Sequence, residues 1–183
     1  MYCALDTEHT GFHEGSNLLT AAFVVFDWDG SVIDELELDL KHPTYNVDLK
    51  AMEVNKIDLF EHDAKAEEIS ACAHKLRCFL NKHTYNKESK ERELLIPVGS
   101  GVQADINLLA KSGLPTFGFS HQVRDLTIIA SFLRECGVIK AEKIGLENLA
   151  KYARIPHNAH TAIGDARASM EVFIWMTTLI LWF

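Results

Sequence analysis

The segment LLTAAFVVFDWDGSVIDELELDL, residues 18–40, decides the fold. Its first part, residues 18–27, is an almost unbroken apolar run with many β-branched and aromatic residues, which is typical of a strand. Asp29 and Gly30 then supply a turn. From residue 32 to residue 40 apolar and acidic residues alternate, which indicates a strand with one exposed face. The segment therefore predicts an antiparallel β-hairpin.

Strands and helices alternate around this hairpin. The apolar run at residues 2–5 predicts a buried strand before it, and residues 94–98 predict another after it. Helical spacing of apolar residues predicts helices over residues 63–80, 102–109, 125–136, 146–153 and 165–183. This order indicates an α/β fold with a mixed sheet, in which the opening hairpin strands are antiparallel, later strands are parallel, and helices flank the sheet. We expect residues 1–183 to form a single domain.

The charge balance excludes one class of function. The 183 residues include 26 acidic side chains against 18 Lys and Arg, a formal net charge of -8. A protein that holds nucleic acid through bulk basic charge needs the opposite balance, so any nucleic-acid chemistry must be local. A content of 48% hydrophobic and 24% charged residues is the profile of a globular fold and excludes disordered and fibrous classes.

The cysteines and the two ends of the chain indicate the cellular compartment in which we expect the protein. The cysteine spacings fit neither a Cys-x-x-Cys pair nor a secreted disulfide framework, which predicts buried thiols in a reducing compartment. The cysteines are Cys3, Cys72, Cys78 and Cys136. No signal peptide is recognisable at the start, so we expect a cytoplasmic protein. Residues 172–183 are very apolar but shorter than the about 20 residues that cross a bilayer. They predict a buried last helix that does not contact a membrane. A homodimer could form through this helix, or a protein partner could bind to it.

Two carboxylates follow the first predicted strand. In an extended chain, residues i and i+2 point to the same side, so Asp6 and Glu8 face one way. Two carboxylates at the end of a buried strand repel each other and lose hydration, which is costly unless a cation lies between them. The pair indicates a divalent metal site or, equally, a solvated strand end or helix cap.

Two further acidic residues stand at the beginning of predicted helices. Asp105 follows Gly99-Ser100-Gly101, and Asp165 opens the last helix with His160 five positions before it. Each of these aspartates, taken alone, is explained by the helix dipole, which favours an acidic side chain in the first turn.

Together, these residues resemble the DEDDh (DnaQ-like) family of 3′–5′ exonucleases, which includes polymerase proofreading subunits, RNase T and oligoribonuclease. Residues 6–11 look like the first family motif, residues 105–109 like the second and residues 160–166 like the third. The resemblance covers nearly the whole chain and implies an RNase H-like fold. Gly99-Ser100-Gly101 stands where many members have Gly-His-Asn, and Thr20 replaces a Glu common in the second strand.

The resemblance implies a metal-dependent exonuclease that releases nucleoside 5′-monophosphates from the 3′ end of single-stranded DNA or RNA. Four carboxylates are assigned by it as ligands of two Mg²⁺ or Mn²⁺ ions: Asp6, Glu8, Asp105 and Asp165. An all-oxygen ligand set suits these small hard cations. The resemblance makes His160, and not the neighbouring His157, the general base that takes a proton from the attacking water. Thr7, Thr10 and Phe12 are candidate substrate contacts.

Two other functions remain open at this point. A catalytically silent module would use the same fold to bind a nucleic-acid end or a protein partner. A related metal nuclease of the RNase H-like fold would cut internally. Basic residues flank the third motif and are candidates for guiding a substrate: Lys140, Lys143, Lys151 and Arg154.

Overall fold

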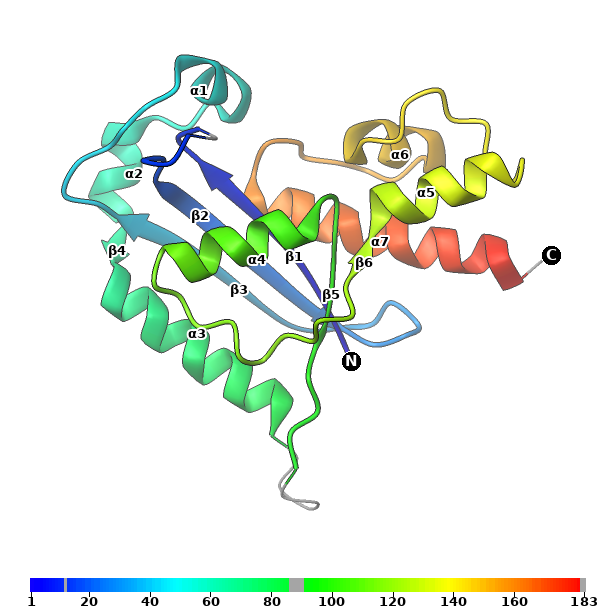
Figure 1. Cartoon of the computed structure of the whole chain (residues 1–183), viewed down its shortest axis with the longest axis horizontal. Coiled ribbons are helices and arrows are strands. Elements are labelled where there is room, and N and C mark those ends of the chain that lie inside the picture. Colours follow the sequence, from blue (N-terminus) through cyan, green and yellow to red (C-terminus); the bar gives the residue numbers. More distant parts are fainter. Residues whose placement is uncertain (12, 86–90, 182–183) are drawn as a thin grey trace.

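The computed structural model describes residues 1–11, 13–85 and 91–181. A six-stranded mixed sheet runs through this part of the chain, with helices on both faces (Figure 1). The strands are β1 (Tyr2–His9), β2 (Leu18–Phe26), β3 (Val32–Lys41), β4 (Glu67–Glu68), β5 (Ile96–Gly99) and β6 (Arg124–Asp125). The helices are α1 (Leu49–Asn55), α2 (Leu59–Lys65), α3 (Ile69–Thr84), α4 (Val102–Lys111), α5 (Leu126–Glu135), α6 (Leu146–Ala153) and α7 (Ala162–Leu181).

The predicted hairpin forms the centre of the sheet. Its turn is closed by two backbone hydrogen bonds, from Asp27 N–H to the carbonyl of Ser31 and from Gly30 N–H to the carbonyl of Asp27. Gly30 has φ +86°, a conformation that favours glycine. β2 pairs antiparallel with β1 and β3, β5 pairs parallel with β1, and the strand order is β4-β3-β2-β1-β5-β6. The mixed sheet predicted from the sequence is confirmed.

Two hydrophobic cores lie on opposite faces of the sheet. β2 is buried at every residue because helices cover both of its faces. Phe23 and Val25 pack with side chains of α3 and α4 on one face. Val24 and Phe26 pack with side chains of α5, α6 and α7 on the other. By the same alternation along β1, Asp6 and Glu8 belong to the face covered by α7.

Three predicted boundaries were wrong. β1 continues to His9, so Asp6 and Glu8 lie within the strand and pair with Ala22 and Thr20 of β2. The helix predicted over residues 63–80 is divided into α2 and α3, because residues 67–68 leave helical conformation to pair as β4 with the end of β3. α7 begins at Ala162, ahead of Asp165.

The polar stretch of sequence at residues 83–93 begins inside α3, which ends at Thr84. His83 and Thr84 are buried in the last turn of α3. His83 Nε2 lies 2.8 Å from Asp34 Oδ2, so an acidic partner on β3 compensates for the burial of the imidazole. Residues 86–90 of this stretch lie outside the described residues.

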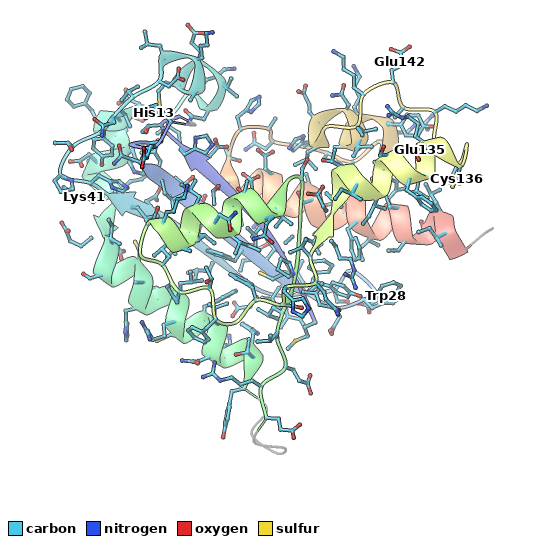
Figure 2. The ribbon with its side chains drawn as sticks, viewed as in Figure 1. His13, Trp28, Lys41, Glu135, Cys136 and Glu142 are labelled. Carbon is cyan, nitrogen blue, oxygen red and sulfur yellow. The ribbon has the colours of Figure 1, made fainter. Side chains whose placement is uncertain are left out.

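The prediction of four buried thiols was half right. Cys3 and Cys72 are buried, whereas Cys78 and Cys136 are exposed. Cys78 sits on the outward face of α3, and Figure 2 shows Cys136 at the far end of α5. Sequence spacing alone does not reveal which face of a helix a cysteine occupies.

The last helix is buried only in part. Val172, Phe173 and Met176 of α7 lie in the core, but Ile180 is 54% exposed. Within the described residues, none of the helices has the combination of length and hydropathy that crossing a membrane requires.

Phe23 provides a test of the core. Its ring packs against the rings of Phe79 and Phe119 in the centre of the first core. We expect Phe23→Ala to lower the free energy of unfolding by about 3–5 kcal/mol, because the removed ring leaves a cavity that the sheet cannot close. Urea denaturation followed by circular dichroism measures this change.

The control is Phe60→Ala on α2, where the side chain is 91% exposed. We expect this variant to change the free energy of unfolding by less than about 0.5 kcal/mol. Equal losses in the two variants would contradict the placement of Phe23 in the core.

Candidate active site

Three carboxylates from the two ends of the chain meet at the end of β1. Asp6 and Glu8 project from the α7 face of the strand, and Asp165 lies in the first turn of α7. One oxygen of each of these three side chains lies within 4.8 Å of those of the other two. Figure 1 shows α7 beginning beside the end of β1. The fold therefore brings together the first and third sequence motifs.

Asp105 lies beside this group and is held from the other face of β1. Thr7 Oγ1 donates a hydrogen bond of 2.5 Å to Asp105 Oδ1. Asp105 is in the first turn of α4, and its negative charge helps to raise the pKa of both Asp6 and Glu8. Thr7, predicted as a substrate contact, thus anchors an acidic residue of the site.

Two glycines let α4 begin close to β1. A Cβ at Gly99 would stand 2.9 Å from the carbonyl oxygen of Leu5, so a larger residue would push β5 and β1 apart. Gly101 caps α4 with φ +74°, a backbone conformation that glycine adopts without strain. The small residues before the second motif therefore set the distance between Asp105 and β1.

The carboxylates destabilise one another in the absence of a cation. Burial, followed by repulsion from the other carboxylates, raises the pKa of Asp6 well above its usual range and that of Glu8 to about 7. Burial also raises the pKa of Asp105 to about 6, despite the hydrogen bond from Thr7. A divalent cation would offset both the loss of hydration and the repulsion among the carboxylates. An all-oxygen donor set suits a hard ion such as Mg²⁺ or Mn²⁺. The donor set fits such an ion.

The third motif forms a tight loop around Asp165. His160 has φ +65°, and its backbone N–H donates a hydrogen bond of 3.2 Å to Asp165 Oδ2. A Cβ at Gly164 would lie 2.3 Å from the carbonyl oxygen of Asn158, so the loop packs directly against the first turn of α7. This packing holds the backbone of His160 next to Asp165.

His157 is a site residue that the sequence did not identify. Its Nε2 contacts Asp165 Oδ1, and its side chain is only 9% exposed. Its Nδ1 is buried and has no hydrogen-bond partner among the described residues. The motif spacing selects His160, and the approach of His157 depends on the path of the loop. Both oxygens of Asp165 are therefore held by the loop that precedes it.

Two cavities border the carboxylates. The larger, of about 590 Å³, is lined by Asp6 and Asp105 together with residues of the first-motif loop and of α4. The smaller, of about 280 Å³, is lined by Glu8, Thr20 and His160. The carboxylate group thus separates a larger cavity from one that holds the predicted general base.

Thr10 and Phe12 are the other two predicted substrate contacts. Thr10 is fully buried, and its Oγ1 accepts a hydrogen bond of 2.8 Å from the N–H of Asn17, so it stabilises the loop after β1. Phe12 lies outside the described residues. His9 is the last residue of β1 and accepts a hydrogen bond at Nδ1 from Gly11 N–H.

The sheet order and the covering helices define the class of this fold. They match the RNase H-like exonuclease fold, with the acidic cluster at the end of its first strand. No family model matches the sequence, and no curated protein matches it either.

Solved structures with this architecture include forms of Exonuclease I from E. coli. The complex with a dT13 oligonucleotide has a TM-score of 0.76 and 22% identity, and covers 99% of this chain. A zinc-bound complex with single-stranded DNA has a TM-score of 0.75 and 22% identity, and again covers 99% of this chain. A complex with a dA16 oligonucleotide has a TM-score of 0.72 and 20% identity, and also covers 99% of this chain. The chain spans 42% of the length of the Exonuclease I chain in each of these three structures.

The raised pKa of Glu8 predicts how stability depends on pH without metal. A carboxyl whose folded-state pKa exceeds its unfolded value of 4.5 contributes stability below that value, and loses it as pH rises through about 7. We expect the melting temperature in chelator to fall between pH 5 and pH 8 more steeply in the wild type than in Glu8→Gln. Adding Mn²⁺ at pH 8 should raise the wild-type value. Identical dependence of the melting temperature on pH in the two proteins would contradict the raised pKa of Glu8.

The two histidines of the loop should have separable effects. His157 contacts a carboxylate of the site, so we expect His157→Ala to weaken Mn²⁺ binding by about 10–100-fold, as loss of a residue that orients a metal ligand does. His160→Ala removes a side chain from the cavity beside Glu8 and should leave Mn²⁺ affinity within about threefold of wild type. Isothermal titration calorimetry measures both. Equal weakening by the two changes would mean that the His157 contact has no separate role.

Proposed function

We propose that this chain is a metal-dependent 3′–5′ exonuclease that releases nucleoside 5′-monophosphates from single-stranded nucleic acid. The observation that carries the proposal is the meeting of Asp6, Glu8 and Asp165 beside the loop of His160. The likeness in fold to Exonuclease I, solved with single-stranded DNA, supports the same class of substrate.

The proposed metal ligands are the four carboxylates Asp6, Glu8, Asp105 and Asp165. Mg²⁺ or Mn²⁺ ions, two in the proposal, would neutralise the scissile phosphate and make a bound water more acidic. Thr7 orients the carboxylate of Asp105 through its hydrogen bond. The side chain of His157 and the backbone of His160 orient the two oxygens of Asp165. Two of the four proposed ligands, Asp105 and Asp165, are thus oriented by hydrogen bonds before substrate arrives.

His160 is the proposed general base. It lines the same cavity as Glu8, so its imidazole can take a proton from a water next to that carboxylate. Histidine is the side chain most often used as a general base at neutral pH. His157 is not the base in this proposal, because its Nε2 is occupied by Asp165.

The larger cavity is the proposed site of the terminal nucleotide. It adjoins Asp6 and Asp105 and is bordered by Gly11 and Ala104, whose small size leaves room beside the carboxylates. A strand that enters with its 3′ end here places its last phosphate next to the acidic group. Cleavage at that phosphate releases one nucleotide at a time.

The test uses 5′-labelled single-stranded DNA and RNA with Mg²⁺ or Mn²⁺. We expect a ladder that shortens from the 3′ end, and no cleavage by Asp165→Asn, because that change removes the negative charge of a proposed metal ligand. The matched control is Asp27→Asn in the exposed hairpin turn, which should retain wild-type activity. Denaturing gel electrophoresis resolves the products.

The alternatives give different results in the same assay. Internal fragments without a ladder would indicate an endonuclease. Retained binding without cleavage by the wild-type protein would indicate a catalytically silent module. Wild-type activity in Asp165→Asn would overturn the assignment of the ligands.

A further inference from the structure

A third cavity lies away from the carboxylates. It has a volume of about 490 Å³ and is formed by α6 and the loop that precedes it. Three lysines line it, Lys140, Lys143 and Lys151, together with Asn148 and Tyr152. The residues around this cavity supply amine, amide and aromatic groups.

The three lysines form no ion pair within the described part of the chain. Other basic side chains of the described residues do pair with carboxylates, namely Lys41, Lys65, Lys75, Lys82 and Arg167. Glu142 is the one carboxylate among the described residues that line the cavity, and Figure 2 shows it at the outer edge of the loop, directed away from the body of the protein. In a chain with a net charge of -8, this is a local concentration of unneutralised positive charge.

Tyr152 places an aromatic ring next to these lysines. Its ring contacts Trp175 of α7 at a centroid distance of 5.9 Å, and its hydroxyl accepts a hydrogen bond of 3.2 Å from the backbone N–H of Lys140. The side chain is nevertheless 45% exposed. A ring that is held by such an edge-to-face contact and by its hydroxyl, and that is partly exposed, can stack with a nucleobase, and such stacking does not depend on base identity.

The cavity is connected to the candidate active site by a short segment. α6 leads into the loop of His157 and His160, and Figure 1 shows this loop returning to the start of α7. Lys151 and His157 are six residues apart, so their Cα atoms are separated by at most about 20 Å. A single strand a few nucleotides long can bridge such a separation.

We propose that this cavity binds the sugar-phosphate backbone of single-stranded nucleic acid upstream of the 3′ end. Lys143 and Lys151, with Lys140, contact phosphates, and Tyr152 stacks with a base. The combination of clustered cations and an exposed aromatic ring favours a single strand over an acidic peptide, which would use the charge but leave the ring unstacked. This inference rests on the proposed function and adds a second substrate contact, away from the carboxylates.

The test compares the double variant Lys143→Gln/Lys151→Gln with a matched control, Lys75→Gln/Arg77→Gln. The control residues are exposed on α3, which packs on the other face of the sheet. Binding of a fluorescein-labelled oligothymidylate of about 12 nucleotides is measured by anisotropy in chelator over a range of salt concentrations. Both double variants remove two charges, so a general effect of net charge appears in both.

We expect the α6 variant to weaken binding about tenfold and to reduce the slope of log Kd against log salt by about 1.4, or about 0.7 for each phosphate that a lysine no longer neutralises. In the presence of Mn²⁺, its KM for the oligonucleotide should rise by a similar factor while kcat is retained. The control variant should match the wild type in affinity, slope and KM.

Failure of this inference and failure of the proposed function are distinguishable. A wild type that degrades the oligonucleotide while the α6 variant retains its affinity, salt slope and KM overturns the backbone site alone. A wild type that binds but does not degrade, with binding weakened in the α6 variant, supports the backbone site and overturns the exonuclease. Equal losses in both double variants overturn the site, because they reflect net charge only.

Discussion

The repulsion among partly buried carboxylates near the end of β1 is the interaction on which the rest of the site depends. Asp6 and Glu8 share a face of β1 because strand side chains alternate, and the start of α7 adds Asp165 to the same place. Hydrophobic contacts of β1, β2 and α7 hold these charges together against their mutual repulsion. The stability of the core is thus used to maintain a concentration of negative charge that favours the binding of a divalent cation.

Both layers of helices serve this arrangement. α4, on one face of the sheet, supplies Asp105 and is tied to β1 by Thr7. α7, on the other face, supplies Asp165, and the loop before it fixes both carboxylate oxygens. Because the proposed ligands come from a strand and from the first turns of two helices, their positions are set by regular structure. The larger cavity lies between these rigid elements and the loop that follows β1.

Local sequence signals account for what could be predicted. The apolar run of β2 and the Asp-Gly turn identify the hairpin, and the i, i+2 carboxylates with the His160 to Asp165 spacing identify the acidic group. Non-local contacts account for the rest. The apolar spacing continues across residues 66–68, and only pairing with β3 divides α2 from α3 there. The contact of His157 with Asp165 depends on the close packing of Gly164 against Asn158, which spacing alone does not show.

The alternation of β1 has a consequence for how this site can change over evolution. Leu5 belongs to one core, Ala4 to the other, and Asp6, Thr7 and Glu8 continue the same two-residue period. Inserting or deleting one residue in this strand would turn every following side chain to the opposite face. Such a change would direct Thr7 toward Asp165 and move both carboxylates to the α4 side. The same alternation of side chains along β1 therefore determines both the packing of the two cores and the position of the carboxylates. Selection that preserves the packing also preserves the site, and the reverse holds as well.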